Sequence, residues 1–314
     1  MNLLEALRYL AALDQHRHFG RAAQACHITQ PALSNALRAL ESELGVALVR
    51  RSRQYEGLTT EGEVVLAHAH RLLHGSESMR QDLASLAGAP RGQLKIGVVP
   101  SAIPVATRFA ARLHAAHPGL RPVLRSMSSQ EIEAGLDSLA IDLGLGFTGR
   151  AEVAEHKLRV LPQYREHYFL LRRAGGRQRL RFGAPLPWRE AARRSLVLLT
   201  PEMHNRAVVE QALRDAGAQV EPAMETNSVL ALLLAVQADA GLAAVLPGAL
   251  VGTAREQAGL QAHPLVAPEV HTEVGWLSSG SAPPSRAVSV ALDCAAEADW
   301  QIELDRHSGA LAAD

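Results

Sequence analysis

Cysteine is scarce in this chain of 314 residues, and long apolar runs are missing. The two cysteines, Cys26 and Cys294, stand far apart and form no C-x-x-C pair, which excludes a disulfide framework and fits a reducing cytoplasm. No stretch reaches the roughly 18 to 20 apolar residues of a membrane-spanning helix, and no basic segment precedes an apolar one at the amino terminus. We therefore expect a cytoplasmic protein of two or three domains, neither exported nor embedded in a membrane.

Lysine is equally rare, since only Lys95 and Lys157 occur, and the chain has no net charge. Lysine plus arginine and aspartate plus glutamate both number 32, so no overall basic excess indicates a polyanionic partner. Almost every cation is an arginine, whose guanidinium holds phosphate with two hydrogen bonds. Any binding of nucleic acid therefore has to depend on a local surface.

The first part of the chain is instead rich in leucine and alanine at helical spacing. One helix is expected from Leu3, a second short one follows Gly20, and a turn at 27–29 leads into a third helix at Gln30. Thr29 is a plausible N-cap, and leucines spaced four and three apart place a buried stripe on the third helix. Two interpretations stay open: a helix-turn-helix unit that lays its third helix in the major groove, or a helical bundle whose polar face is only solvated.

An arginine cluster then favours the first interpretation. Arg50, Arg51 and Arg53 lie within four residues, where a wing or hairpin can reach a phosphate backbone or a minor groove. The positive excess of residues 1–60 is small, but it is concentrated in this loop.

A capping box, Thr60 with Glu63, opens a long helix over residues 61–88. Steps of four and three residues continue over three heptads, a pattern typical of a coiled-coil seam. We expect this helix to pair two subunits through Val65, Ala69, Leu72, Met79, Leu83 and Leu86. A helix packed along its own domain is the alternative. Glycine and proline around 89–93 predict a hinge.

From Leu94 strands alternate with helices at intervals of about 25 residues, which predicts parallel sheets with crossover helices. The expected strands are 94–99, 123–126, 141–147, 168–171, 196–199, 220–224 and 241–245. They form two similar α/β units with a cleft between them, and the segment 270–297 returns to the first. We place one subdomain at about 94–165 and 268–300, a second at about 166–267, and a tail at 301–314.

Four sequence blocks in the first part, at 18–23, 28–34, 40–46 and 58–62, resemble the amino-terminal signature of LysR-type transcriptional regulators. The later organisation is similar to that family's linker helix and effector domain, so the resemblance covers nearly the whole chain. It implies an α/β protein with an amino-terminal winged helix-turn-helix, a long linker helix and a two-subdomain effector domain that resembles periplasmic binding proteins. It also implies a dimer, usually assembled into a tetramer, that binds promoter DNA and bends it differently when a small metabolite enters the cleft.

The DNA-contacting residues follow from matching positions of the recognition helix and the wing. Gln30 can bond adenine in bidentate fashion, and Ser34 can bond phosphate. Asn35 departs from the arginine common in the family, and Val49-Arg50-Arg51 departs from the usual Phe-Glu/Asp-Arg, which makes the wing more basic. The expected DNA contacts are Thr29, Gln30, Pro31, Ser34, Asn35, Arg38, Arg50, Arg51 and Arg53.

The expected effector site lies where strands end and helices begin, outside the strand ends of both subdomains. Its candidate residues are Ser101, Ala102, Ser128, Ser129, Phe147, Thr200, His204, Asn205, Arg206 and Asn227. Hydroxyls and amides at helix N-termini favour a small anion, so we predict a carboxylate or similar effector. The alternative is that each serine is only an N-cap.

Other sequence patterns do not support a cofactor, a metal site, a thiol switch or an enzymatic activity. The glycines of 144–149 match G-x-G-x-x-G but lie in the third expected strand rather than before a helix, so no nucleotide cofactor is predicted. His70 and His74 have no third metal ligand nearby, and Cys294 has no partner for a thiol switch, which argues against peroxide sensing. With no hydrolase, zincin or P-loop motif we do not expect an enzyme. A transport-type solute-binding protein is the rival class.

Overall fold

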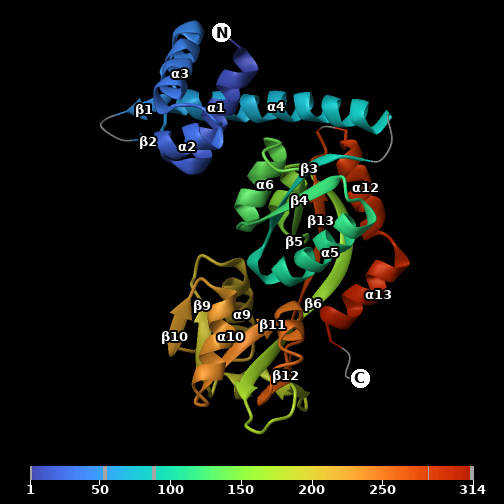
Figure 1. Ribbon diagram of the computed structural model, residues 1–314. Coiled ribbons are helices and arrows are strands. Elements are labelled where there is room, and N and C mark those ends of the chain that lie inside the picture. The colour runs from blue at the N-terminus through green and yellow to red at the C-terminus, as the bar shows by residue number, and fades with distance from the viewer. Residues whose placement is uncertain (1, 52–54, 87–89, 282, 312–314) are drawn as a thin grey trace. The chain divides into compact units, whose positions relative to one another are not determined.

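The computed structural model describes residues 2–51, 55–86, 90–281 and 283–311 (Figure 1). The chain divides into two compact units, one with Met1–Gly88 and Asp137–Ala140 and the other with Ala89–Leu136 and Ile141–Asp314. No helix among the described residues has both the length and the apolar character needed to cross a membrane.

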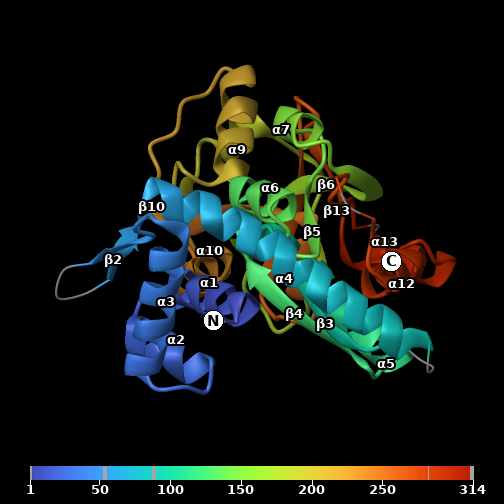
Figure 2. The same cartoon turned by 90° about the horizontal axis from the view of Figure 1, so that it is seen from above.

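The first unit is a bundle of helices with a small hairpin. Its elements are α1 (Leu3–His16), α2 (Phe19–Ala25), α3 (Gln30–Leu44), β1 (Val49–Arg51), β2 (Tyr55–Leu58) and α4 (Thr60–Leu86). Leucines and alanines of α1, α2 and α3 form its core, which also takes in Leu48 and Leu58 beside the hairpin. Figure 2 shows that the second half of α4 extends well past the three shorter helices. The helical spacing read from the sequence therefore corresponds to a real core.

Local capping explains where α3 begins and ends. The Thr29 hydroxyl accepts a hydrogen bond from the Ala32 N–H at 3.4 Å, and Pro31 occupies the first turn, where no intrahelical N–H is needed. At the other end Gly45 adopts a φ of 73°, a left-handed conformation that glycine takes without steric cost. These signals fix the length of the third helix at about four turns.

The second unit has two lobes, each built on a mixed sheet. In the first lobe the strand order is β4 (Leu120–Ser126), β3 (Gly92–Val98), β5 (Leu143–Phe147), β13 (His271–Ser278) and then β6 (Arg159–Arg173). The parallel pairs β3–β4 and β3–β5 match the prediction, and β13 returns to pair antiparallel with β5. The helices are η1 (Pro100–Ala102), α5 (Ile103–Ala116), α6 (Ser129–Asp137), α7 (Ala151–Glu155), α12 (Arg286–Ala295) and α13 (Ala298–His307).

The second lobe repeats the pattern around β9 (Ser195–Leu199). Its strand order is β10 (Met224–Thr226), β9, β11 (Leu242–Pro247), β6 and β12 (Leu260–Val266), with the short β7 (Arg181–Phe182) and β8 (Leu186–Pro187) on β12. Its helices are α8 (Trp188–Ala191), α9 (His204–Asp215), α10 (Val229–Ala238) and α11 (Gly248–Thr253). Separate hydrophobic clusters cover the two faces of this sheet.

Strand β6 belongs to both lobes, as Figure 1 shows. Its first half pairs with β13 and its second half with β11 and β12. The sequence predicted only a part of its second half, 168–171, because the charged residues that precede this apolar stretch hide the rest of the strand. The strand expected at 220–224 begins instead at Met224.

The prediction of a tail at 301–314 is wrong for residues 301–307. Residues 301–307 continue helix α13, in which Trp300 and Leu304 are buried in the core of the first lobe. Leu311 packs into the core of the second lobe. The returning segment expected at 270–297 contains β13 and α12, and α13 follows it after a turn between Ala295 and Ala298.

A buried carboxyl group lies in β6 near the change of lobe. The Glu166 side chain accepts hydrogen bonds from backbone N–H groups, including that of Ala249 at 3.3 Å. Burial nevertheless raises the pKa of Glu166 to about 8, and the backbone donors offset only part of this effect. The folded protein therefore keeps this proton at pH values where the unfolded chain has released it.

This difference predicts a pH dependence of stability. Between about pH 4.5 and 8 the folded state binds more protons than the unfolded state, so Glu166 lowers the free energy of unfolding as the pH rises, by about 1.4 kcal/mol per pH unit. The Glu166→Gln variant should lose this contribution. Urea unfolding at several pH values from 5 to 9 measures it, with Glu273→Gln on an exposed carboxylate as the control. Parallel curves for wild type and Glu166→Gln would contradict the assignment.

Candidate functional site

The exposed face of α3 carries most of the residues predicted to contact DNA. Thr29, Gln30, Pro31, Asn35 and Arg38 are exposed, and Ser34 is half-buried, while Leu33, Leu37 and Leu40 turn into the core. Gln30, Ser34 and Arg38 are four residues apart, which places their side chains along one line of the helix. A polar surface with one cation therefore lies along the helix from its first turn.

The acidic residue Glu41, three residues after Arg38 on α3, makes hydrogen bonds within the unit. Glu41 is partly buried, and its Oε1 accepts hydrogen bonds from the N–H groups of Leu48 at 2.9 Å and Val49 at 3.2 Å. The carboxylate thus anchors the start of the hairpin to α3. Its negative charge is directed at these two N–H groups.

The predicted wing is an antiparallel hairpin of β1 and β2. Arg50 is exposed, and its Nε donates to the Leu58 carbonyl at 2.6 Å, which leaves the remaining guanidinium N–H groups available for a phosphate. The structure describes Arg51 by its backbone alone, and Arg53 lies outside the described residues. Tyr55 packs edge-on against Phe19, so the hairpin is attached to the helices through an aromatic contact.

Helix α4 divides the residues of the predicted seam into two groups. Ala69 is fully buried in the unit's own core and Val65 packs against that core, so the assignment of Ala69 to a subunit contact is wrong. Leu72, Met79 and Leu83 have exposed fractions of 51%, 57% and 61%. The structure describes Leu86 by its backbone alone. Packing along its own unit therefore applies to the first half of the helix, and pairing of two subunits stays a prediction for the second half.

A cavity of about 490 Å³ lies between the two lobes of the second unit. Seven of the ten predicted effector residues line it, at the ends of strands and the starts of helices: Ser101, Ser128, Ser129, Phe147, His204, Asn205 and Asn227. Ala102, Thr200 and Arg206 do not. Ala102 is completely buried, and the Thr200 hydroxyl donates to Glu202 at 2.6 Å.

Arg206 has a structural role. It is 6% exposed, its Nε bonds Glu210 at 2.7 Å, and its Nη1 bonds Glu225 at 2.6 Å and the Leu199 carbonyl. These partners connect α9 to the ends of β9 and β10. Because Arg206 does not line the cavity and its guanidinium connects these elements, we do not assign it to an effector.

Arg150 is the cavity residue that sequence reasoning missed. Its guanidinium bonds Glu133 at 2.7 Å and Glu152 at 3.0 Å, and its Nη1 lies 3.4 Å from His204 Nδ1. These hydrogen bonds and charges raise the pKa of Arg150 further. The signal was available, since Arg150 follows the strand β5 much as Ser101 follows β3.

His204 meets Arg150 across the two lobes. Burial, followed by the charge of Arg150, lowers the pKa of His204. A guanidinium only donates hydrogen bonds, so His204 Nδ1 accepts and the ring is neutral. The ring also packs against Phe147, with centroids 4.5 Å apart and ring planes tilted by 46°. This end of the cavity thus presents one guanidinium and one neutral imidazole.

The polar groups that line the cavity differ in whether they already have hydrogen-bond partners within the protein. Ser128 and Glu131 form a reciprocal cap, with Ser128 N–H donating to Glu131 at 2.7 Å, so for this serine the N-cap alternative is correct. Ser129 is 9% exposed, and its hydroxyl has no hydrogen-bond partner in the structure. Asn205 accepts from the Tyr168 hydroxyl at 3.0 Å through Oδ1, which leaves its amide N–H groups for a ligand. A buried hydroxyl without a partner is costly unless a ligand or water satisfies it.

Comparisons with known proteins agree with this organisation. Residues 4–63 match the family model described as bacterial regulatory helix-turn-helix protein, lysR family, and residues 87–300 match the LysR substrate binding domain. The SDS degradation transcriptional activation protein of Pseudomonas sp. (strain ATCC 19151) is 41% identical over 122 residues, 38% of this chain and 40% of that protein. A probable hydrogen peroxide-inducible genes activator of Streptomyces viridosporus is 30% identical over 82% of this chain and 81% of its own.

A solved structure extends the likeness to the whole chain. A full-length OxyR variant from Pseudomonas aeruginosa has a TM-score of 0.69 at 25% identity and covers 94% of this chain and 97% of its own. The alignments span less than half the length of the first curated relatives. The family models together reach from the first helix to α13, including the helix-turn-helix that a transport protein would not need. The chain belongs to the LysR family of bacterial regulatory helix-turn-helix proteins.

Proposed function

We propose that this protein binds promoter DNA as a dimer through its first unit and that a small molecule in the 490 Å³ cavity changes the DNA complex. The polar line of Gln30, Ser34 and Arg38 on α3, together with Arg50 on the hairpin, is the observation that supports the DNA-binding part. Side chains at the start of a helix in the major groove contact base edges, and flanking arginines contact phosphates. Fluorescence anisotropy with duplex DNA from the gene's upstream region, against a scrambled duplex, tests this part.

Pairing of two subunits is supported by the second half of α4. Leu72, Met79 and Leu83 continue the four-and-three spacing and are more than half exposed. Two such stripes would bury each other as a coiled-coil seam, and the resulting dimer would present two α3 helices to two half-sites. A dimer of dimers, which the family resemblance implies, extends this proposal.

The seam yields a direct prediction for subunit association. The double variant Met79→Glu/Leu83→Glu places like charges in the seam and should convert the dimer to a monomer with at least ten-fold weaker DNA binding. Analytical ultracentrifugation gives the mass. The control is Arg71→Glu, an exposed position of α4 off the seam, which should stay dimeric. An unchanged mass for the double variant would exclude the seam.

For the effector we propose a small carboxylate or similar anion. The unpartnered Ser129 hydroxyl and the Asn205 amide support this class, because both can donate hydrogen bonds. Arg150 lines the same cavity and adds a positive charge there, while its guanidinium is also paired with Glu133 and Glu152. Glu131 and Glu202 also line the cavity and restrict an anion to the end that holds Arg150. Calorimetric titration of the full chain with carboxylates and their matched neutral amides tests the charge. Binding to the amides alone would refute the anion.

We do not propose peroxide sensing through the cysteines, although several relatives are named for hydrogen peroxide induction. Burial raises the pKa of Cys26 and that of Cys294, so neither thiol readily forms the reactive thiolate. We expect the Cys26→Ser/Cys294→Ser variant to keep its response to the effector.

A further inference from the structure

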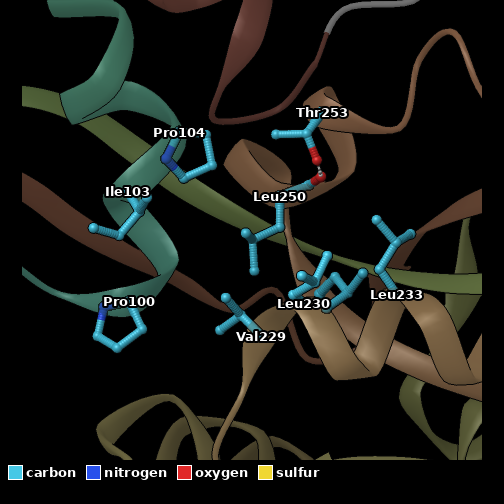
Figure 3. A pocket seen from close by; sticks show the side chains of 9 residues that line it. Pro100, Ile103, Pro104, Val229, Leu230, Leu233, Leu250 and Thr253 are labelled. Carbon is cyan, nitrogen blue, oxygen red and sulfur yellow. Dashed lines mark hydrogen bonds between the residues drawn. The ribbon is translucent and has the colours of Figure 1, made fainter. Parts of the chain in front are cut away.

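A second cavity of about 220 Å³ adjoins the polar one (Figure 3). It lies between the start of α5 in the first lobe and α10, β11 and α11 in the second. Its lining residues are Pro100, Ile103, Pro104, Val229, Leu230, Leu233, Leu246, Leu250 and Thr253. None of the residues predicted from the sequence as effector contacts is among them.

The walls of this second cavity offer a ligand no free polar side chain. Eight of the nine lining residues are apolar, and the ninth, Thr253, donates its hydroxyl to the Leu250 carbonyl at 2.6 Å. Figure 3 shows this bond and the apolar side chains that face the space around it. A cavity with such walls binds hydrocarbon better than water, because water needs two or more polar partners.

The two cavities are adjacent. Pro100 and Val229 line both the apolar cavity and the polar one. Ser101 follows Pro100 directly and is a polar lining residue, whereas Ile103, one turn further, faces the apolar side. A ligand that spans both cavities would place a polar group on one side of Pro100 and Val229 and an apolar group on the other.

We infer that the effector is amphipathic, with a polar or anionic head in the polar cavity and an unbranched hydrocarbon tail in the apolar cavity. The inference rests on the proposed function, since it takes the polar cavity as the effector site. Ser129, Asn205 and Arg150 bond the head. Ile103, Leu233 and Leu250 surround the tail.

The volume of the apolar cavity limits the length of the tail. Groups the size of a water molecule or a methylene occupy about 30 Å³ each, so 220 Å³ holds about seven of them. Each buried methylene contributes a free energy equivalent to about four-fold in affinity. The affinity should therefore rise with each carbon and then level off near seven tail carbons.

The test is calorimetric titration of the full chain with straight-chain carboxylates from butanoate to decanoate, together with the corresponding primary amides. We expect affinity to increase about four-fold per methylene up to octanoate and to change little beyond it. The amide series shows whether the head must be charged, which tests the anion proposal separately from the tail.

Two matched variants locate the tail. Ile103→Trp fills the apolar cavity and does not touch the polar one, so octanoate should bind at least ten-fold more weakly while butanoate is unaffected. Leu234→Trp is the control, because Leu234 is an exposed residue of α10 outside both cavities.

Each other outcome overturns the inference. Equal affinity for short and long chains excludes the tail site and leaves the polar effector site standing. If none of these carboxylates binds, the tail site and the proposed anionic effector are both refuted. If Ile103→Trp weakens the binding of butanoate and of octanoate equally, the tail does not lie in the apolar cavity. If Ile103→Trp changes only the subunit association, a second copy covers the apolar cavity.

Discussion

The Arg150→Ala variant should unfold at a markedly lower urea concentration than the wild type, with a loss of about 3–5 kcal/mol in the free energy of unfolding of the second unit. The reason is Glu133, whose side chain is only 3% exposed and which loses its 2.7 Å partner. A carboxylate left buried and unpaired is costly, and neither Glu152 nor His204 can replace a guanidinium.

Two further variants separate this effect from a simple loss of contacts. Arg150→Met/Glu133→Gln removes both charges and should recover most of the stability, because no buried charge is left unpaired. Arg165→Ala breaks a pair with Glu273 of similar length, 2.9 Å, but both side chains are about half exposed, so it should cost no more than about 1 kcal/mol. Equal losses for Arg150→Ala and Arg165→Ala would show that Glu133 does not depend on Arg150.

The Gln30→Ala variant should lose about 1–3 kcal/mol of DNA-binding free energy per subunit and should discriminate less among bases at one position of each half-site. Gln30 is exposed in the first turn of α3, where a bidentate amide can reach an adenine. Anisotropy titrations with a set of single-base-pair variants of the promoter duplex measure both effects.

Arg38→Ala should act differently, because Arg38 follows Gln30 by two turns and carries charge rather than a base-reading amide. Its affinity should fall by a similar factor for every sequence, and the slope of log K against log salt should become shallower by about 1 per subunit. Arg193→Ala removes an exposed arginine of the second unit and serves as the control. A sequence-dependent loss in Arg38→Ala would mean that this residue contacts a base.

Much of the first unit was predictable because its signals are local. The stripe of Leu33, Leu37 and Leu40 and the cap at Thr29 depend on neighbours within one or two turns. The heptads of α4 were equally visible, but a four-and-three repeat does not say which partner covers it. Ala69 packs on its own unit, and Leu72 three residues later does not.

The cavity between the lobes was predictable in position but not in its charges. Strand ends and helix starts converge in any sheet of this kind, which is why Ser101, Ser129 and Asn205 were found. Whether an arginine is free depends on partners distant in sequence. Arg206 is held by Glu225, 19 residues away, and Arg150 is held by Glu133, 17 residues away. No local sequence pattern indicates that these residues pair.

Binding of the full-length protein to its own upstream DNA over a range of salt concentrations is the most direct test of the account. The predicted result is one dimer per site at low salt, with log K falling linearly as log salt rises, because arginines displace counterions from phosphates. A protein that remains a single subunit and does not bind this DNA even at low salt would contradict it.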